Sequence, residues 1–165
     1  IEDKPVLIPL GVDQDPHFRI TRDVAPKINK FKPALIHNMM IPSLLGPGGK
    51  MSASDEKSTV YTTDSPEMVK KKINKYAFSG GQSDADEHRK IGGNPDIDVS
   101  YQYLRMFFEP DDTKLKKIYD DYKSGKMLTG ELKAILIEKI NKFLSAHQEK
   151  REQARKNIDE YMLKD

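Results

Sequence analysis

The side chains most suited to chemistry lie in one glycine-rich stretch, residues 46–54, which reads Gly-Pro-Gly-Gly-Lys-Met-Ser-Ala-Ser. It places one lysine, Lys50, and two hydroxyls, Ser52 and Ser54, within a few residues of each other. An ammonium, two hydroxyl donors and backbone N–H groups are what a loop needs to bind a polyphosphate. The glycines before the lysine let the chain approach a ligand closely. The alternative is a solvated loop that contains a lysine by chance, because so short a motif matches many sequences.

A second group of polar residues follows an apolar run at residues 6–10. Asp13 and Gln14 stand just beyond this run, and open α/β sheets bind ligands beyond the carboxyl ends of their strands. This position favours a binding role for both residues. Asp15 stands directly before a proline, where a carboxylate is typical of a helix N-cap.

The apolar pattern predicts the elements that position these groups. Continuous apolar runs at 6–10 and 34–40 predict buried parallel strands, with a helix between them that runs to about residue 30. A loop at 41–58 carries the lysine, and residues 59–62 predict a third, short extended piece. After residue 64 the pattern predicts only helices: one from 66 to the Gly80-Gly81 pair, one from 99 to 108, one closed by Gly125, and one of about 33 residues that ends near Tyr161.

This order predicts an α/β fold followed by an all-α region. Two or three parallel strands do not form a sheet by themselves, because such strands need both faces covered and their edges paired. The sequence therefore predicts that residues 1–64 are the C-terminal half of a larger nucleotide-binding domain. On this interpretation the first half of that domain is missing.

Composition restricts the function further. The 165 residues contain no cysteine, which excludes a disulfide framework, a thiolate metal site and a cysteine nucleophile. The net charge is only +2, so RNA contacts require a local patch, such as the lysine runs at 70–72 and 114–117. A solvated helix face is the alternative explanation of each run. No run approaches the roughly 18 apolar residues of a membrane helix and no signal peptide begins the chain, so we expect no membrane partner.

Three stretches, taken in order, resemble the class I aminoacyl-tRNA synthetases, specifically the tryptophanyl family of archaeal and eukaryotic type. They are residues 11–23 (G-V-D-Q-D-P-H-F-R-I-T-R-D), residues 50–55 (K-M-S-A-S-D), and residues 77–81 (A-F-S-G-G) with their continuation at 92–100 (G-G-N-P-D-I-D-V-S). The similarity runs through nearly the whole chain. A tyrosine-specific relative is an alternative, but we expect that family to lack the D-Q-D-P-x-F and A-F-S-G-G stretches.

What the resemblance implies is amino-acid activation. The carboxylate of tryptophan attacks the α-phosphate of ATP, which arrives with Mg²⁺, and the tryptophanyl group then passes to tRNA(Trp). Lys50 would stabilise the charge on the leaving pyrophosphate, and Ser52 and Ser54 would bind the phosphates. The backbone of Met51 would lie near the adenine. Such chemistry depends on alignment and charge stabilisation, so no nucleophilic side chain and no tightly bound metal are expected.

The resemblance also assigns roles outside this loop. Asp13 matches a position near the ATP ribose, and Gln14 matches a position that reaches the amino or carboxylate group of tryptophan. At Ala53 the sequence departs from the common motif, which has a second lysine there. One phosphate-binding charge is therefore absent from the loop.

The resemblance further implies a catalytic part at residues 1–75 and a helical anticodon-binding domain at residues 76–165. It implies a cytoplasmic enzyme that is a homodimer when full length. The expected tRNA contacts near the loops of the helical part are Gln82, Ser83, Arg89, Lys126 and Lys133.

Two observations leave other functions open. The H-I-G-H-type motif of this superfamily is not in the sequence, so we expect the chain alone to bind ATP poorly and not to turn over. The helical part could instead be a non-catalytic RNA-binding module. A different nucleotidyltransferase with the same phosphate-loop chemistry is a further alternative.

Overall fold

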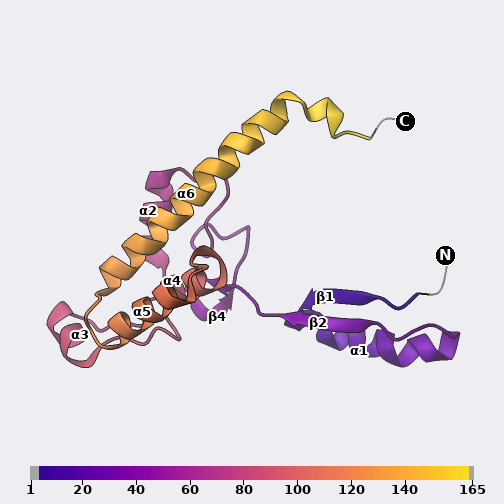
Figure 1. Ribbon diagram of the computed structural model, residues 1–165, viewed down its shortest axis with the longest axis horizontal. Coiled ribbons are helices and arrows are strands. Elements are labelled where there is room, and N and C mark those ends of the chain that lie inside the picture. The colour runs from indigo at the N-terminus through magenta and orange to yellow at the C-terminus, as the bar shows by residue number, and fades with distance from the viewer. Residues whose placement is uncertain (1–3, 164–165) are drawn as a thin grey trace. The chain divides into compact units, whose positions relative to one another are not determined.

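The structure is a computed structural model that describes residues 4–163 (Figure 1). The chain divides into two compact units, and the division falls between Ile41 and Pro42. Each unit has its own secondary structure and its own buried residues. The predicted functional boundary between residues 75 and 76 stays a prediction.

The first unit is a pair of parallel strands joined through a helix. Leu7 pairs with Ala34 and Gly11 with Asn38, so the predicted parallel pairing is confirmed, but the predicted burial is not, since most residues of both strands are exposed. In chain order its elements are β1 (Leu7–Gly11), a 3₁₀ turn (Val12–Gln14), α1 (Asp15–Val24), a second 3₁₀ turn (Ala25–Ile28) and β2 (Ala34–Asn38).

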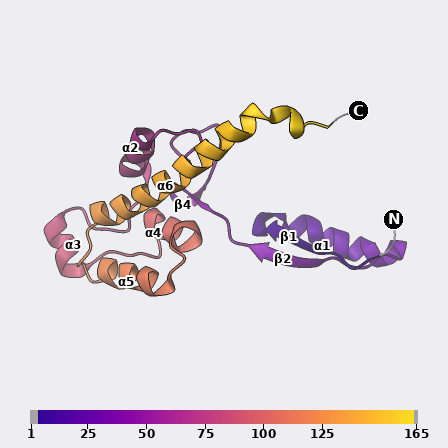
Figure 2. The same cartoon turned by 45° about the horizontal axis from the view of Figure 1, so that its top comes forward.

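This unit buries few of its apolar side chains. Leu10 is buried, but the exposed fraction is 60% for Leu7, 64% for Ile20 and 48% for Ile36. Figure 2 shows α1 alongside the two strands. Parallel strands are normally covered on both faces, so this pair has apolar surface available for burial against further chain.

The second unit is mainly helical (Figures 1 and 2). Its elements are β3 (Pro42–Ser43), β4 (Gly46–Lys50), α2 (Pro66–Tyr76), α3 (Ala85–Ile91), α4 (Val99–Tyr103) with a π-helical continuation (Leu104–Phe108), α5 (Asp112–Lys123), α6 (Thr129–Lys156) and a 3₁₀ turn (Ile158–Glu160).

Two expectations about this unit were wrong. Residues 59–62 were expected to be a third, short extended piece, but within the described chain they form no strand. The segment 41–58 was expected to be a loop, yet it begins with an antiparallel pair, β3 and β4. The short helix α3 was not predicted, because its residues are mostly polar and show no apolar stripe.

Side chains cap the starts of several helices. Ser65 accepts a hydrogen bond from the Met68 N–H, and Asp111 accepts from two N–H groups at the start of α5. The N-cap role of Asp15 was wrong, because α1 begins at Asp15 itself and no side chain caps it. Its carboxylate binds Arg19 and His37 instead, which offer stronger, charge-assisted donors.

The core of the second unit forms where α2, α4, α5 and α6 pack together. Ile73, Leu104, Tyr122 and Leu136 are among its fully buried side chains. On α6 the buried stripe stops at Leu144 and Phe143 is exposed. Ile158 and Tyr161, which follow the helix, are exposed as well. The helix ends at Lys156, so it is shorter than predicted and extends past the core that it helps to form.

Candidate functional site

Backbone hydrogen bonds attach the segment that carries the lysine motif to the core of the second unit. We call residues 50–58 the phosphate loop, because they carry the side chains predicted to bind phosphates. Just before it, Leu44 is fully buried, and its N–H donates to the carbonyl of Ser58 at 2.9 Å. The N–H of Phe78 donates to the carbonyl of Leu44 at 2.7 Å. These bonds attach Ser58, the last residue of the phosphate loop, to the buried Leu44 and through it to Phe78.

Ser58 closes the phosphate loop from inside. Its hydroxyl lies 2.8 Å from the carbonyl of Asp55 and 3.0 Å from that of Ser52, and it accepts from the Ser52 N–H at 3.1 Å. The N–H of Asp55 donates to the carbonyl of Ser52 at 3.2 Å. Because Ser58 is buried, water does not compete for these bonds, and the turn is formed before any ligand binds.

The predicted phosphate-binding hydroxyls come together on this turn. The Oγ atoms of Ser52 and Ser54 lie 2.8 Å apart and share a hydrogen bond. Met51 is half-buried and packs against the core of the unit. Lys50 is the last residue of β4, and its side chain lies outside the described residues.

Asp13 and Gln14 lie together in the first unit, on the 3₁₀ turn that follows β1. The side-chain amide of Gln14 donates to the carboxylate of Asp13 at 3.2 Å, and both residues are exposed. The next residue, Asp15, is bound by Arg19 at 2.5 Å and by His37 at 2.8 Å. The hydrogen bond from Arg19 is the main cause that lowers the pKa of Asp15 below its usual value. His37 is on β2, so this contact links the start of α1 to the neighbouring strand.

Four of the five residues predicted to bind tRNA lie around α3. Arg89 donates to the carbonyls of Gly125 and Lys126 and so ties α3 to the loop before α6. Gln82 donates to the carbonyl of Gly92 at 2.9 Å. Ser83 donates to the carboxylate of Glu87 at 3.1 Å, whereas Lys126 is exposed. The tRNA role of these four residues stays a prediction.

The fifth residue, Lys133, has a different environment. It is 9% exposed on α6, and its ammonium donates to the carbonyl of Asn74 at 3.3 Å. Burial lowers the pKa of this lysine from its usual value. Its contact joins α6 to α2, and its tRNA role also stays a prediction.

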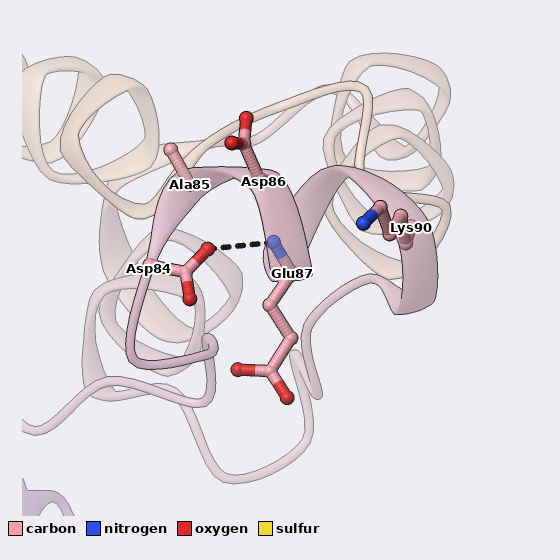
Figure 3. Close-up of a pocket in the computed structure, with 5 residues that line it drawn as sticks. All are labelled: Asp84, Ala85, Asp86, Glu87 and Lys90. Atoms are coloured by element: carbon pink, nitrogen blue, oxygen red, sulfur yellow. Dashed lines mark hydrogen bonds between the residues drawn. The ribbon is translucent and has the colours of Figure 1, made fainter.

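An acidic pocket of about 450 Å³ lies at the start of α3 (Figure 3). The carboxylate of Asp84 caps the helix by accepting from the Glu87 N–H at 2.8 Å. Asp86 and Lys90 also line the pocket. Three carboxylates around one opening repel RNA phosphates, so this side of α3 is unsuited to the phosphate backbone.

A buried carboxylate that was not predicted from the sequence, Asp98, organises the second unit. One of its oxygens accepts from the Gly80 N–H at 2.9 Å and from the Tyr122 hydroxyl at 2.8 Å, and the other accepts from the Ser100 N–H at 2.8 Å. Desolvation raises the pKa of Tyr122 to about 12. An aspartate before an apolar helix is an N-cap signal, but its complete burial has no signal in the sequence.

The third motif stretch therefore has a structural role. A Cβ atom at Gly80 would lie 1.9 Å from the carbonyl oxygen of Asn94, so the two motif segments pass in backbone contact. Asp98 joins them by accepting the Gly80 N–H. The A-F-S-G-G and G-G-N-P-D-I-D segments build one junction beneath the phosphate loop, since Phe78 also binds Leu44.

Between residues 4 and 163, no group of three His, Asp or Glu side chains is placed to hold a metal ion. Over the same range, none of the helices combines the length and the apolar content needed to cross a membrane.

Known proteins that are similar to this chain support the resemblance that its three motif stretches indicated. The sequence model of the family described as tRNA synthetases class I (W and Y) matches residues 2–145. A tryptophan–tRNA ligase of Sulfurisphaera tokodaii is 57% identical over 158 residues, which are 96% of this chain and 42% of that protein.

Two solved structures from Aeropyrum pernix allow the tryptophanyl and tyrosyl members of this family to be compared with the chain. Its tryptophanyl-tRNA synthetase is 38% identical with a TM-score of 0.85, over 92% of this chain and 42% of that one. Its tyrosyl-tRNA synthetase is 25% identical with a TM-score of 0.67, over 87% of this chain and 42% of that one. The chain spans about two fifths of the length of these relatives. By the family match and the higher similarity to tryptophan enzymes, the chain belongs to the class I tRNA synthetases of tryptophan and tyrosine, in their tryptophanyl group.

Proposed function

We propose that this chain carries part of the active site of a tryptophan–tRNA ligase. The enzyme would form tryptophanyl-adenylate from tryptophan and ATP and pass the tryptophanyl group to tRNA(Trp). The observation that carries this proposal is the preformed phosphate loop, whose two seryl hydroxyls lie 2.8 Å apart directly after Lys50. Such a turn presents donors to phosphate oxygens without reorganisation, which is how active sites stabilise developing charge.

The proposed roles follow the chemistry of each group. Lys50 supplies the positive charge for the leaving pyrophosphate, and Ser52 and Ser54 bind phosphate oxygens. The backbone of Met51 lies along the adenine. Mg²⁺ arrives bound to ATP, because its ligands there are phosphate oxygens and water.

The first unit supplies the other ligand groups. Asp13 accepts from the ribose hydroxyls of ATP, and Gln14 binds the amino or carboxylate group of tryptophan. Their exposure on the turn after β1 supports both roles. The apolar surface of β1, β2 and α1 supports the proposal that residues 1–75 complete a larger catalytic domain.

The direct test is Lys50→Ala in the full-length enzyme. We expect tryptophan-dependent pyrophosphate exchange to fall about 10²- to 10³-fold, because a charge that stabilises the transition state is lost. Calorimetry should give a tryptophan Kd within about twofold of wild type. The matched control is Lys57→Ala, which removes another lysine of the same loop. Equal losses of exchange and tryptophan binding in Lys50→Ala would contradict the proposed role.

We further propose that residues 76–165 form the anticodon-binding domain, with the exposed Lys126 facing RNA phosphates. Charge reversal in Lys126→Glu should weaken tRNA(Trp) binding about tenfold, because one phosphate contact becomes repulsive. Pyrophosphate exchange without tRNA should not change. Lys27→Glu, an exposed lysine of the first unit, is the control. A Kd for tRNA that is equal in the two variants and wild type would rule out this contact.

The remaining parts of the proposal concern the whole enzyme. It is a cytoplasmic homodimer, and light scattering of the full-length protein tests the assembly. The alternative, a non-catalytic RNA-binding module, predicts that residues of the helical part bind an anticodon stem-loop while full-length protein shows no pyrophosphate exchange. A tyrosine-specific enzyme predicts exchange with tyrosine instead of tryptophan.

A further inference from the structure

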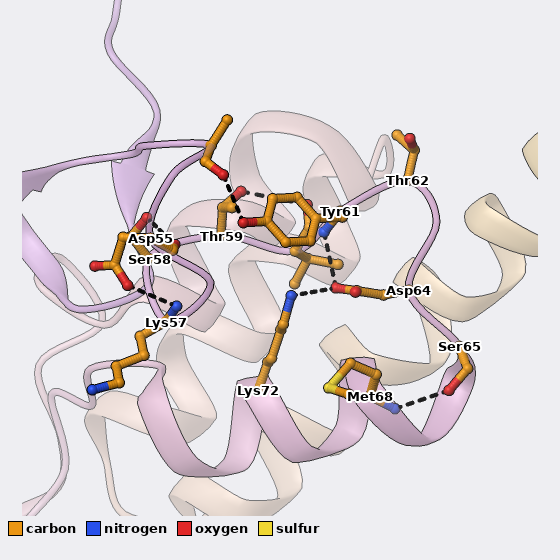
Figure 4. A network of polar contacts seen from close by, with 12 residues as sticks. Asp55, Lys57, Ser58, Thr59, Tyr61, Thr62, Asp64, Ser65, Met68 and Lys72 are labelled. Atoms are coloured by element: carbon orange, nitrogen blue, oxygen red, sulfur yellow. Dashed lines mark hydrogen bonds and ion pairs between the residues drawn. The ribbon is translucent and has the colours of Figure 1, made fainter.

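A polar network lies between the phosphate loop and the two helices α2 and α6 (Figure 4). The hydroxyl of Tyr61 donates to the carbonyl of Ala53 at 2.7 Å, in the middle of the loop motif. Ala53 therefore has a role here through its backbone, although its side chain carries no charge. Tyr61 itself lies outside the motif and has none of the roles assigned above.

The ring of Tyr61 is fixed from the other side. The ammonium of Lys72 lies 4.1 Å from the centre of the Tyr61 ring, as a cation–π contact requires. Lys72 is on α2 with only 5% of its side chain exposed, and it forms an ion pair with Asp64 at 2.7 Å. The same Asp64 oxygen accepts from the Tyr61 N–H at 2.9 Å. These contacts leave the phenol ring little freedom, so its hydroxyl holds one position.

The network reaches α6 through one side chain. The amide of Gln148 donates to the carbonyl of Thr62 at 2.9 Å and to that of Asp64 at 3.1 Å. Gln148 lies past Leu144, where the buried stripe of α6 ends. The exposed half of the long helix is thereby attached to the segment that carries Tyr61.

We propose that Tyr61 is a positioning residue of the phosphate loop, and that Lys72, Asp64 and Gln148 fix Tyr61 relative to α2 and α6. Through this path the position of the long helix affects how well the loop is aligned on ATP. The proposal rests on the proposed function, because the loop must act on ATP for its alignment to matter. It predicts that changes in the network alter the kinetics with respect to ATP and leave tryptophan binding unchanged.

The test is Tyr61→Phe in the full-length enzyme, which removes only the hydroxyl and keeps the ring over Lys72. We expect kcat/KM for ATP in pyrophosphate exchange to fall about fivefold to tenfold, as for the loss of one positioned hydrogen bond. The tryptophan Kd should stay within about twofold of wild type. Hydrogen exchange of the amides in residues 51–58 should become faster. The control is Tyr119→Phe, which removes the half-buried hydroxyl that donates to Asp96 at 3.1 Å, away from the loop.

A second pair of variants tests the path to α6. Gln148→Ala should also speed hydrogen exchange in residues 51–58 and lower kcat/KM for ATP by about twofold to fivefold. The control Gln102→Ala removes an amide that likewise donates to two backbone carbonyls, those of Pro95 and Asp96. It should leave the loop unchanged.

The outcomes separate this proposal from the proposed function. Unchanged loop exchange or unchanged ATP kinetics in Tyr61→Phe overturns the role of Tyr61, and equal effects of Tyr61→Phe and Tyr119→Phe do the same. A Gln148→Ala enzyme that matches Gln102→Ala overturns the path to α6. If wild-type enzyme shows no tryptophan- and ATP-dependent exchange, the proposed function fails, while the loop amides still show whether Tyr61 holds the loop.

Discussion

Replacing Asp98 by alanine should lower the local free energy of unfolding of the second unit by about 3–5 kcal/mol. The substitution leaves the N–H groups of Gly80 and Ser100 without their acceptor inside the core, and the hydroxyl of Tyr122 keeps only the hydroxyls of Ser79 and Thr129 as partners. Each buried donor that loses its partner costs about 1–3 kcal/mol, and a small cavity adds to the loss. Native-state hydrogen exchange of amides in α4 and α5 measures the change.

Asp111→Ala is the matched control for this prediction. Asp111 also caps a helix through two N–H groups, but 43% of its side chain is exposed. Water can replace the contacts of Asp111, so we expect its replacement to lower the free energy of unfolding by only about 1 kcal/mol. If the two variants lose the same stability, Asp98 is an ordinary cap and does not organise the core. The phenol of Tyr122 gives a second readout, because its pKa should fall when the neighbouring carboxylate is removed.

Gly92→Ala should lower the local free energy of unfolding of the second unit, around α3 and the end of α5, by about 4 kcal/mol or more. Gly92 has a φ of 76° and a ψ of −178°, a combination that residues with a Cβ avoid. A Cβ there would also lie 1.9 Å from the carbonyl oxygen of Lys123, so the backbone of α5 would have to move. The predicted result is faster hydrogen exchange in α3 and at the end of α5, with a lower melting temperature.

The control for Gly92 is Gly130→Ala in the first turn of α6. At Gly130 no described atom lies within 4 Å of the Cβ position, and the backbone is helical. Alanine is the better helix former there, so we expect the free energy of unfolding to rise by about 0.5–1 kcal/mol. A Gly92→Ala protein as stable as wild type would show that the chain can shift at the end of α3 without cost.

The predictions that succeeded rest on local chemistry. The strands β1 and β2 were predicted from two continuous apolar runs. The helices α2, α4, α5 and α6 were predicted from apolar side chains at helical spacing. In each case the residues within one segment determine the type of the element.

The failures depend on partners that are distant in sequence. Asp15 has the sequence context of a cap, but His37, on the next strand, takes its carboxylate. Tyr61 in the expected extended piece binds Ala53 and the α2 lysine instead of a strand partner. The burial of Asp98 depends on Gly80 and Tyr122, which lie on either side of it in sequence. The ion pair of Asp15, the contacts of Tyr61 and the burial of Asp98 all depend on residues that meet only in the tertiary fold. Local sequence patterns therefore do not predict them.

The open strand pair of the first unit bears on how assembly measurements should be interpreted. Its outer backbone edges and its apolar side chains offer a template on which a second copy can add strands. A dimer of the 165-residue chain by itself would then arise from edge-to-edge pairing. We expect such a species to dissociate on dilution and to disappear when a lysine replaces Ile36, whereas a dimer of the full-length enzyme should survive both treatments.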